Sequence, residues 1–158
     1  MKEKDLPPRP PEYTPAEWAE YHRDPCGWCV KELRNPGPEV RCSAADILRG
    51  LGKDAEAAVP ALVAGFGDPD EQVRAYCVHA LVDIGYALRE RAAAAVPALA
   101  GLLRDGNAEV RSLAAHALGA IGPAATPAAA GLRRLLADPN AETREAAAAA
   151  LGRIGARA

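Results

Sequence analysis

The chain has 158 residues, enough for one domain, and a formal net charge of −2. This charge argues against a nucleic-acid-binding protein, because such proteins usually present a strongly basic face. Hydrophobic residues make up 49% of the chain but aromatic residues only 4%, which favours close-packed helices over strands. No apolar run approaches the roughly 18 residues of a membrane span, and the first residues lack the apolar stretch of a secretory signal. Four cysteines, most simply interpreted as reduced thiols, predict a cytoplasmic protein.

Residues 1–13 carry several charges together with Pro7, Pro8, Pro10 and Pro11. Because proline fixes φ and lacks an amide donor, we expect a flexible or extended arm here. A short polyproline ligand for a domain of another protein is the alternative.

Two helices are predicted to follow this arm. Thr14 and Glu17 form a capping box, and Pro15 at the first helical position favours a helix that runs to about Arg23. Asp24 is a second cap and opens a helix over residues 26–34, which the prolines and glycine of the next four residues end.

An arginine and a glycine recur at a fixed separation along the rest of the chain. The pairs are Arg41 with Gly52, Arg74 with Gly85, Arg111 with Gly122, and Arg144 with Gly155. Successive arginines are 33, 37 and 33 residues apart, and a period in this range indicates stacked repeats. We assign repeats to residues 35–68, 69–105 and 106–138, a partial repeat to 139–158, and a degenerate capping repeat to 14–34.

Each repeat is predicted to contain two helices. Apolar residues at helical spacing follow each arginine, and the glycine after them can adopt the left-handed conformation that closes a helix. The second helix is expected over residues 59–66 and 96–103, each with a proline near its start. The second repeat has four more residues than the first between its glycine and this proline, so we expect residues 86–91 to lengthen the second helix or to form a bulging loop.

The pattern D-x-x-x-x-V-R, followed by A-L-x-x-I-G and a proline-led second helix, resembles HEAT repeats, and among them the short bacterial kind first noted in phycobilisome lyases. The resemblance covers about residues 35–155 and implies an all-α, right-handed α-solenoid of HEAT-like helical hairpins. It also implies a ladder of hydrogen bonds between turn aspartates and first-helix arginines of adjacent repeats. The residues at the ladder positions are Asp68, Arg74, Asp105, Arg111, Asp138 and Arg144. Arg41 has Asn35 in the aspartate position, which suggests a degenerate first link.

The residues before the first full repeat can be aligned with the later repeats. Matching the turn at Asn35 with the later turns places Cys26 and Cys29 at core positions of a second helix. Trp18 and Trp28 are then candidates to cover the open end of the stack, because terminal repeats have one face toward water.

Cysteines near the start offer the strongest candidates for chemistry. Cys26 and Cys29 form a C-x-x-C motif at a helix start, where the helix dipole lowers a thiol pKa in thioredoxin-like proteins. Such sites need a preceding strand, which is absent from the predicted elements, and core packing already explains both cysteines. With His22 and Cys42 they also form a zinc-like ligand set. Cys42 falls off the core stripe and should point away from Cys29, so we predict no metal and no cofactor.

Two histidines share one register, since His79 and His116 each lie five residues after a repeat arginine. This register invites comparison with the HEAT-like di-iron hydroxylases, which carry His-Glu pairs just after the arginine. The chain contains no His-Glu pair, so we expect both histidines on the solvated outer face. Ser43 and Ser112 lie inside predicted helices rather than on a strand–turn elbow, and we predict no enzymatic activity.

The resemblance implies that the second helices line the concave face, where partners usually bind. The exposed basic residues expected on these helices are Lys31, Arg34, Arg104, Arg133 and Arg134. They predict an acidic protein partner, and a merely solvated helix face is the alternative. A phosphate backbone fits less well, because the arginines are few and acids balance them.

We therefore predict a non-catalytic scaffold or adaptor that binds another protein through its concave or end surfaces. The alternatives are an accessory subunit of a lyase or other modifying enzyme and, third, a weak nucleic-acid binder. The last repeat stops at residue 158, after its first helix. We expect a partner or a second copy of the chain to cover the face of residues 146–151, or else this end to fray.

Overall fold

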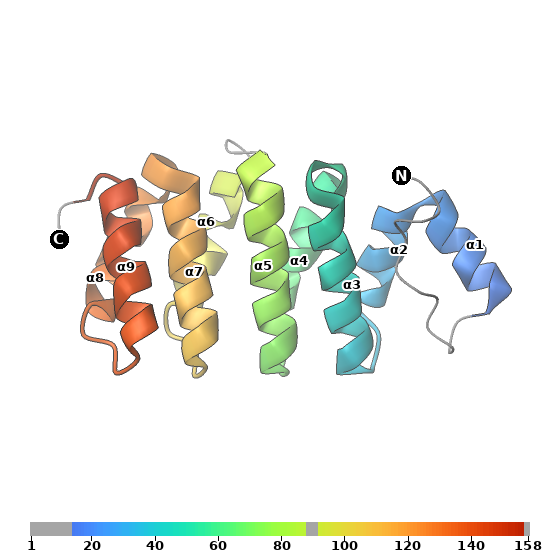
Figure 1. The fold of residues 1–158 in the computed structure, drawn as a ribbon, viewed down its shortest axis with the longest axis horizontal. Coiled ribbons are helices and arrows are strands. Elements are labelled where there is room, and N and C mark those ends of the chain that lie inside the picture. The colour runs from blue at the N-terminus through green and yellow to red at the C-terminus, as the bar shows by residue number, and fades with distance from the viewer. Residues whose placement is uncertain (1–13, 88–91, 157–158) are drawn as a thin grey trace.

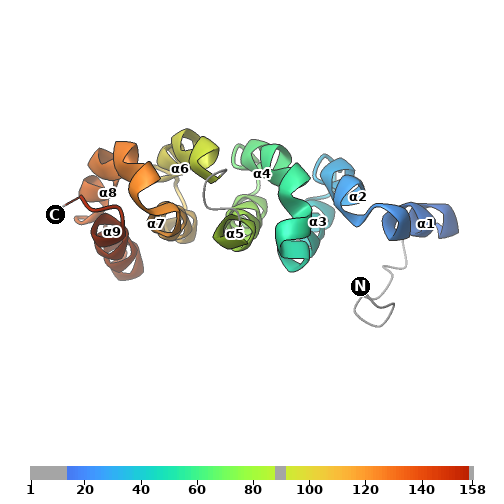
Figure 2. The ribbon, with the colours of Figure 1, turned by 90° about the horizontal axis from the view of Figure 1, so that it is seen from above.

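The computed structural model describes residues 14–87 and 92–156, and every regular element within them is a helix. The predicted arm over residues 1–13 lies outside this range. Figure 1 and Figure 2 show the helices stacked side by side in two layers. The first-helix layer contains α3 (Pro38–Leu51), α5 (Glu71–Ala87), α7 (Ala108–Ile121) and α9 (Ala141–Arg153). The second-helix layer contains α2 (Pro25–Glu32), α4 (Val59–Gly65), α6 (Val96–Leu102) and α8 (Ala129–Leu135). The predicted all-α solenoid of helical hairpins is confirmed.

The N-terminal helix α1 (Pro15–Arg23) begins at the predicted capping box. The Thr14 hydroxyl accepts a hydrogen bond from the Glu17 amide at 3.3 Å, and the Thr14 amide donates to the Glu17 carboxylate at 2.7 Å. The carboxylate of Asp24 accepts from the Gly27 amide at 2.9 Å and so caps α2. Both helix starts therefore lie where the sequence predicts them, because each cap satisfies amides that have no partner inside the helix.

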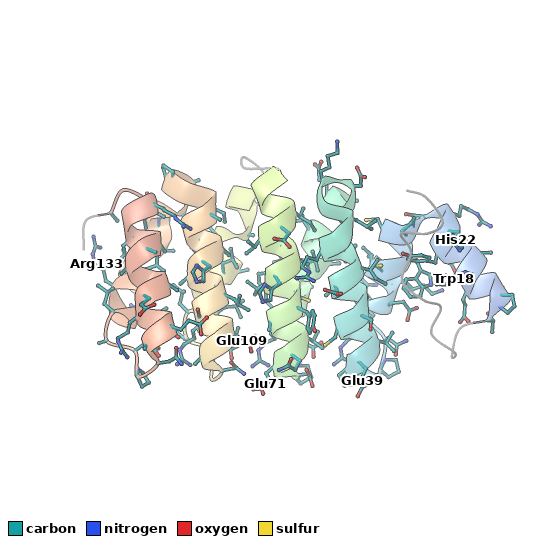
Figure 3. The ribbon with its side chains drawn as sticks, in the orientation of Figure 1. Trp18, His22, Glu39, Glu71, Glu109 and Arg133 are labelled. Carbon is teal, nitrogen blue, oxygen red and sulfur yellow. The ribbon has the colours of Figure 1, made fainter. Side chains whose placement is uncertain are left out.

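Aromatic side chains hold α1 against α2 at the N-terminal end of the stack. Tyr21 is 2% exposed, stacks on Trp18 with ring centroids 5.2 Å apart, and meets Trp28 edge to face at 5.3 Å. Trp28 of α2 belongs to the buried core and Trp18 packs against it. Figure 3 shows Trp18 at this end of the stack. The division of the chain into one degenerate and four later repeats stays an interpretation.

The first helices of three repeats begin at a side-chain cap two residues after the turn aspartate. Asp70 accepts from the Gln72 amide at 2.9 Å, Asn107 from the Glu109 amide at 2.7 Å, and Asn140 from the Thr143 amide at 2.9 Å. This repeated cap fixes the point at which each first helix leaves its turn, so the helices of the layer start in register.

The glycine between the two helices of a repeat does not adopt the left-handed helical conformation that we expected. Gly52 and Gly122 have φ of 54° and 75°, but their ψ values of −125° and −142° lie outside the left-handed helical region. Only a residue without Cβ adopts such a conformation readily. The glycine directs the chain into a 3-10 helix, η2 (Gly52–Ala58) or η4 (Gly122–Ala128), rather than into a left-handed cap.

The longer second repeat departs from the prediction. Helix α5 runs for 17 residues and continues through Gly85 to Ala87, so the expectation that residues 86–91 extend the second helix is wrong for residues 86–87. Glycine permits a positive φ but does not impose one, so the same residue ends α3 at Gly52 and continues α5 at Gly85. The short helix η3 (Ala92–Ala95) then leads into α6, and residues 88–91 lie outside the described residues.

The core lies between the two layers and is built from leucine, isoleucine and small residues. Its fully buried members include Leu48, Leu62, Ile84, Leu99, Leu118, Leu132 and Leu151. Neighbouring helices approach closely at glycines, since a Cβ added at Gly119 of α7 would lie 3.0 Å from the Cα of Ala150 in α9. None of the helices in the described ranges is long and apolar enough to cross a bilayer.

Candidate protein-interaction surfaces

A ladder of ion pairs joins consecutive repeats. In each rung, the Nε and Nη2 atoms of a first-helix arginine donate to the two carboxylate oxygens of the aspartate in the next turn along the chain. The rungs are Arg41 with Asp68 at 2.8 Å for both bonds, Arg74 with Asp105 at 2.8 and 2.9 Å, and Arg111 with Asp138 at 2.8 and 2.9 Å. The two parallel bonds fix both the spacing and the orientation of adjacent repeats.

The third guanidinium nitrogen ties each arginine to its own turn. Nη1 of Arg41 donates to the carbonyls of Asn35 and Pro36 at 2.8 and 3.0 Å, and the later arginines repeat this pair of bonds. Because the contact uses backbone carbonyls, asparagine serves here as well as aspartate. The expected degenerate first link is therefore wrong, and Arg41, which the predicted ladder set omitted, forms a complete rung with Asp68.

The rungs keep their carboxylates ionised. The hydrogen bonds from Arg111 lower the pKa of Asp138 in spite of the burial that opposes this shift. Burial alone would raise the pKa of Asp68 and Asp105, but hydrogen bonds from their arginines and from a turn amide outweigh it and lower both values. The ladder is a structural device that aligns the surfaces described next.

Arg144 occupies the ladder register on α9 but forms only half of a rung. Its Nη1 atom donates to the carbonyls of Asp138 and Pro139 at 2.7 and 3.0 Å, as in the other repeats. No carboxylate within the described ranges reaches its Nε or Nη2 atoms, and its side chain is exposed, whereas Arg41 is buried. Arg144 thus presents a positioned guanidinium with two donors directed away from its own turn.

Basic side chains predicted from the sequence all lie on the second-helix layer or at its turns. The exposed members are Lys31, Arg34, Arg104, Arg133 and Arg134. Lys31 forms an exposed ion pair with Glu20 at 3.4 Å, and Figure 3 shows Arg133 at the far end of the stack from α1. Helices α4 and α6 contain no charged residue and α8 contains only arginines as charged residues, while α2 contains both Lys31 and Glu32. The exposed charge of this layer is therefore basic at α8 and at the turns after α2 and α6. That this layer is also the concave layer stays a prediction.

The surroundings of the cysteines favour neither the redox nor the metal alternative. Burial raises the pKa of the Cys29 thiol to about 12 and also raises that of Cys26, the opposite of the shift that an attacking thiol needs. The ring of His22 packs edge-on against Trp18 with centroids 5.0 Å apart. No three His, Cys, Asp or Glu side chains in the described part of the chain are placed to hold a metal ion, so His22, Cys26, Cys29 and Cys42 are not brought together as ligands.

Sequence reasoning missed a groove on the first-helix layer, which we call the Tyr76 groove. It consists of two adjoining depressions, of about 300 and 330 Å³, that share Tyr76 and Gln72 of α5. One lies against Pro38, Glu39, Cys42 and Asp70, and the other against Asp46, Arg49, His79 and Glu109. His79 thus lines the groove, while His116 is exposed on α7. The available signal was the aromatic residue two positions after Arg74, where the other repeats carry Ser43, Leu113 and Ala146.

Known structures show the same architecture. An engineered protein solved by the Northeast Structural Genomics Consortium matches with a TM-score of 0.73 and 26% identity, over 89% of this chain and 66% of that chain. A designed armadillo repeat protein, at 23% identity, matches with a TM-score of 0.69 over 87% of this chain and 68% of its own, and supports the fold alone. Human deoxyhypusine hydroxylase in complex with glycerol matches with a TM-score of 0.61 and 31% identity, over 84% of this chain and 44% of that chain. The chain thus spans less than two thirds of the engineered protein and less than half of the hydroxylase.

Family membership rests on the sequence match to HEAT repeats, which covers residues 28–99 and 86–152. No curated protein matches the chain. Helical repeat solenoids are typical protein-interaction scaffolds and are generally non-enzymatic, although one structural neighbour is a hydroxylase. The narrower likeness to phycobilisome-lyase repeats and the bacterial origin stay predictions. The chain belongs to the HEAT-repeat family.

Proposed function

We propose that the chain is a non-catalytic scaffold that binds an acidic partner protein through the second-helix layer. The observation that carries this proposal is the set of exposed arginines on that layer, Arg34, Arg104 and Arg134, beside three helices that contain no acid. Guanidinium groups pair with carboxylates through two parallel hydrogen bonds, so an acidic surface complements them. The stacked helices are already ordered, which keeps the entropic cost of binding low.

A charged probe tests this proposal directly. A fluorescent, terminally blocked peptide of ten glutamates is titrated with the protein, and its anisotropy is measured. We expect Arg134→Gln to weaken binding by about 2-fold, the effect of one exposed ion pair. Arg49→Gln removes the same charge from the opposite layer, where Arg49 pairs with Asp46 at 2.7 Å, and should leave the affinity unchanged. Equal weakening by both variants would refute a binding face on the second-helix layer.

The exposed side of α9 is the second surface that we propose for a partner. Arg144 holds its own turn by Nη1 and has two donors for a carboxylate, as in the three complete rungs. A second copy of the chain fits poorly, because its first turn offers Asn35, whose amide already donates to Glu32 at 2.8 Å. We therefore favour a partner chain with an aspartate at a turn. Native mass spectrometry of protein from its own host should show a co-purifying subunit that Arg144→Gln releases, and a homodimer would refute this choice.

The two alternative functions, an accessory subunit of a lyase and a weak nucleic-acid binder, predict different experimental results. An accessory subunit of a lyase would carry a chromophore or a thiol adduct, and the raised pKa values of Cys26 and Cys42 argue against ready adduct formation. A weak nucleic-acid binder would hold duplex DNA with an affinity that falls steeply with salt. Four free thiols support the predicted cytoplasmic location, which cell fractionation tests.

A further inference from the structure

We propose that the Tyr76 groove binds an arginine-bearing segment of a second partner protein. Residues of α3, α5 and α7 and of the turn before α5 line the groove. Figure 2 shows these helices in the layer opposite α4, α6 and α8, to which we assign the acidic partner. The two proposals call for ligands of opposite charge on opposite layers, so one can fail while the other holds.

An aromatic side chain lines both depressions of the groove. With 36% of its surface exposed, Tyr76 is the most exposed large hydrophobic side chain in the described part of the chain. It projects from the middle of α5 and forms a wall of both depressions, with Pro38 and Cys42 adding apolar surface beside it. The remaining large apolar side chains of this layer pack into the core or are half-buried, so the exposed ring of Tyr76 is unusual in its own protein.

The rim of the groove is acidic. Figure 3 shows Glu39 and Glu109 at the same edge of the layer, with Glu71 between them at the start of α5. Glu39 and Glu109 are exposed and form no ion pair within the described residues. The one arginine that lines the groove, Arg49, is already paired with Asp46 at 2.7 Å. Among the described residues that line it, the groove therefore carries excess negative charge and no unpaired arginine or lysine.

An aromatic face beside carboxylates selects a cation that is also planar. A guanidinium group stacks on an aromatic ring and donates paired hydrogen bonds to a carboxylate, whereas a lysine ammonium has no plane to stack. An acidic segment would meet like charge on the rim, and a purely apolar segment would bury these carboxylates without partners. Arginine satisfies both features of the groove at once.

Helix stability offers a competing reason for two of the acids. Glu39 and Glu109 lie in the first turns of α3 and α7, where the helix dipole favours negative charge without any ligand. The dipole does not explain why Tyr76 is exposed between them. Glu142 occupies the same first-turn register on α9 but does not line the groove, so it separates a binding role from a helix-stabilising role.

The experiment uses the full chain and a synthetic probe. The probe is a fluorescent, terminally blocked octapeptide with four arginines alternating with glycine, and its control carries citrulline, the neutral isostere, in place of arginine. Anisotropy gives the affinity for the wild type and for the variants Tyr76→Ala, Glu109→Gln and Glu142→Gln. Backbone amide shifts in ¹⁵N NMR spectra locate the bound peptide, and urea midpoints verify that each variant is folded.

The arginine peptide should bind and the citrulline peptide should not, with amide shifts concentrated on α3, α5 and the first turn of α7. Tyr76→Ala should weaken binding about 2- to 5-fold, as expected for a cation–π contact at an exposed site, and Glu109→Gln about 2-fold. Glu142→Gln should match the wild type in affinity even if it lowers the urea midpoint as Glu109→Gln does. The proposal is overturned by equal weakening from the two glutamate variants, by an unchanged affinity of Tyr76→Ala, by shifts on other helices, or by no binding up to about 1 mM.

Discussion

Arg111 and Arg144 occupy the same register in neighbouring repeats, but only Arg111 completes a rung. The Arg111 side chain donates two hydrogen bonds to the carboxylate of Asp138 and two to backbone carbonyls of its own turn. Arg144 donates only the second pair. Replacing each arginine by glutamine is therefore a matched test of what the carboxylate half of a rung contributes to stability.

The side-chain exposures set the expected size of the effect. Arg111 is 13% and Asp138 is 6% exposed, so Arg111→Gln leaves a nearly buried carboxylate without its cation. Removing one partner of a buried ion pair costs about 3–5 kcal/mol, whereas an exposed pair contributes about 0–1 kcal/mol. We expect a loss of about 2–4 kcal/mol for Arg111→Gln and about 1 kcal/mol or less for Arg144→Gln, which loses only surface hydrogen bonds.

Urea unfolding followed by circular dichroism measures both losses, and amide hydrogen exchange on α7 and α9 detects any uncoupling of the last repeat. Equal destabilisation by the two variants would refute the reasoning, because the rung would then add nothing beyond the turn contacts. Acid titration gives an independent reading. The pKa of Asp138 is lowered from 3.8, so the stabilisation by this pair is complete well above pH 3.8 and is lost as the pH falls toward the lower folded-state pKa. In Arg111→Gln, the free energy of unfolding should therefore fall less steeply as the pH is lowered.

Two further predictions concern packing and thiol chemistry. Gly119→Ala should destabilise the protein by about 1–3 kcal/mol in urea, because its Cβ would lie 3.0 Å from the α9 backbone, whereas Gly101→Ala, with open space around its Cβ in α6, should be neutral or slightly stabilising. Cys29 and Cys77 are fully buried with pKa values raised to about 12, so an Ellman assay at pH 8 should titrate them only after the two half-buried thiols, and at the rate of unfolding. Rapid modification of all four thiols in the native protein would contradict that order.

Features that rest on a residue's chemistry together with its position in the repeat could be predicted from the sequence. The cap at Thr14 and the fold class follow in this way, because caps and a regular period each have a local physical cause. The first rung could not, because Arg41 binds backbone carbonyls of its own turn and an aspartate one turn ahead. A comparison of side chains at the Asn35 position was therefore uninformative about that rung.

Other features depend on how the helices pack in three dimensions rather than on a local sequence pattern. Gly85 occupies the position of a helix-ending glycine, yet α5 passes through it, because glycine allows a helix to break but does not force it to. The groove beside Tyr76 is formed together with residues of α3 and α7, which a repeat pattern does not reveal. Groove residues from three helices were for the same reason invisible along the sequence.

The opposite charges of the two layers have a common origin in the repeat. Free acids such as Glu39 and Glu109 lie in the first turns of first helices, and arginines such as Arg104 and Arg134 lie at or just beyond the ends of second helices, where the helix dipole favours each sign. In the ladder, arginines and aspartates neutralise one another in the interior. The exposed charges therefore determine the electrostatic potential at the surface of each layer. A solenoid of this kind offers two surfaces that do not compete for the same ligand. An acidic and a basic partner could occupy it together, each weakened by salt and each lost through variants on its own layer alone.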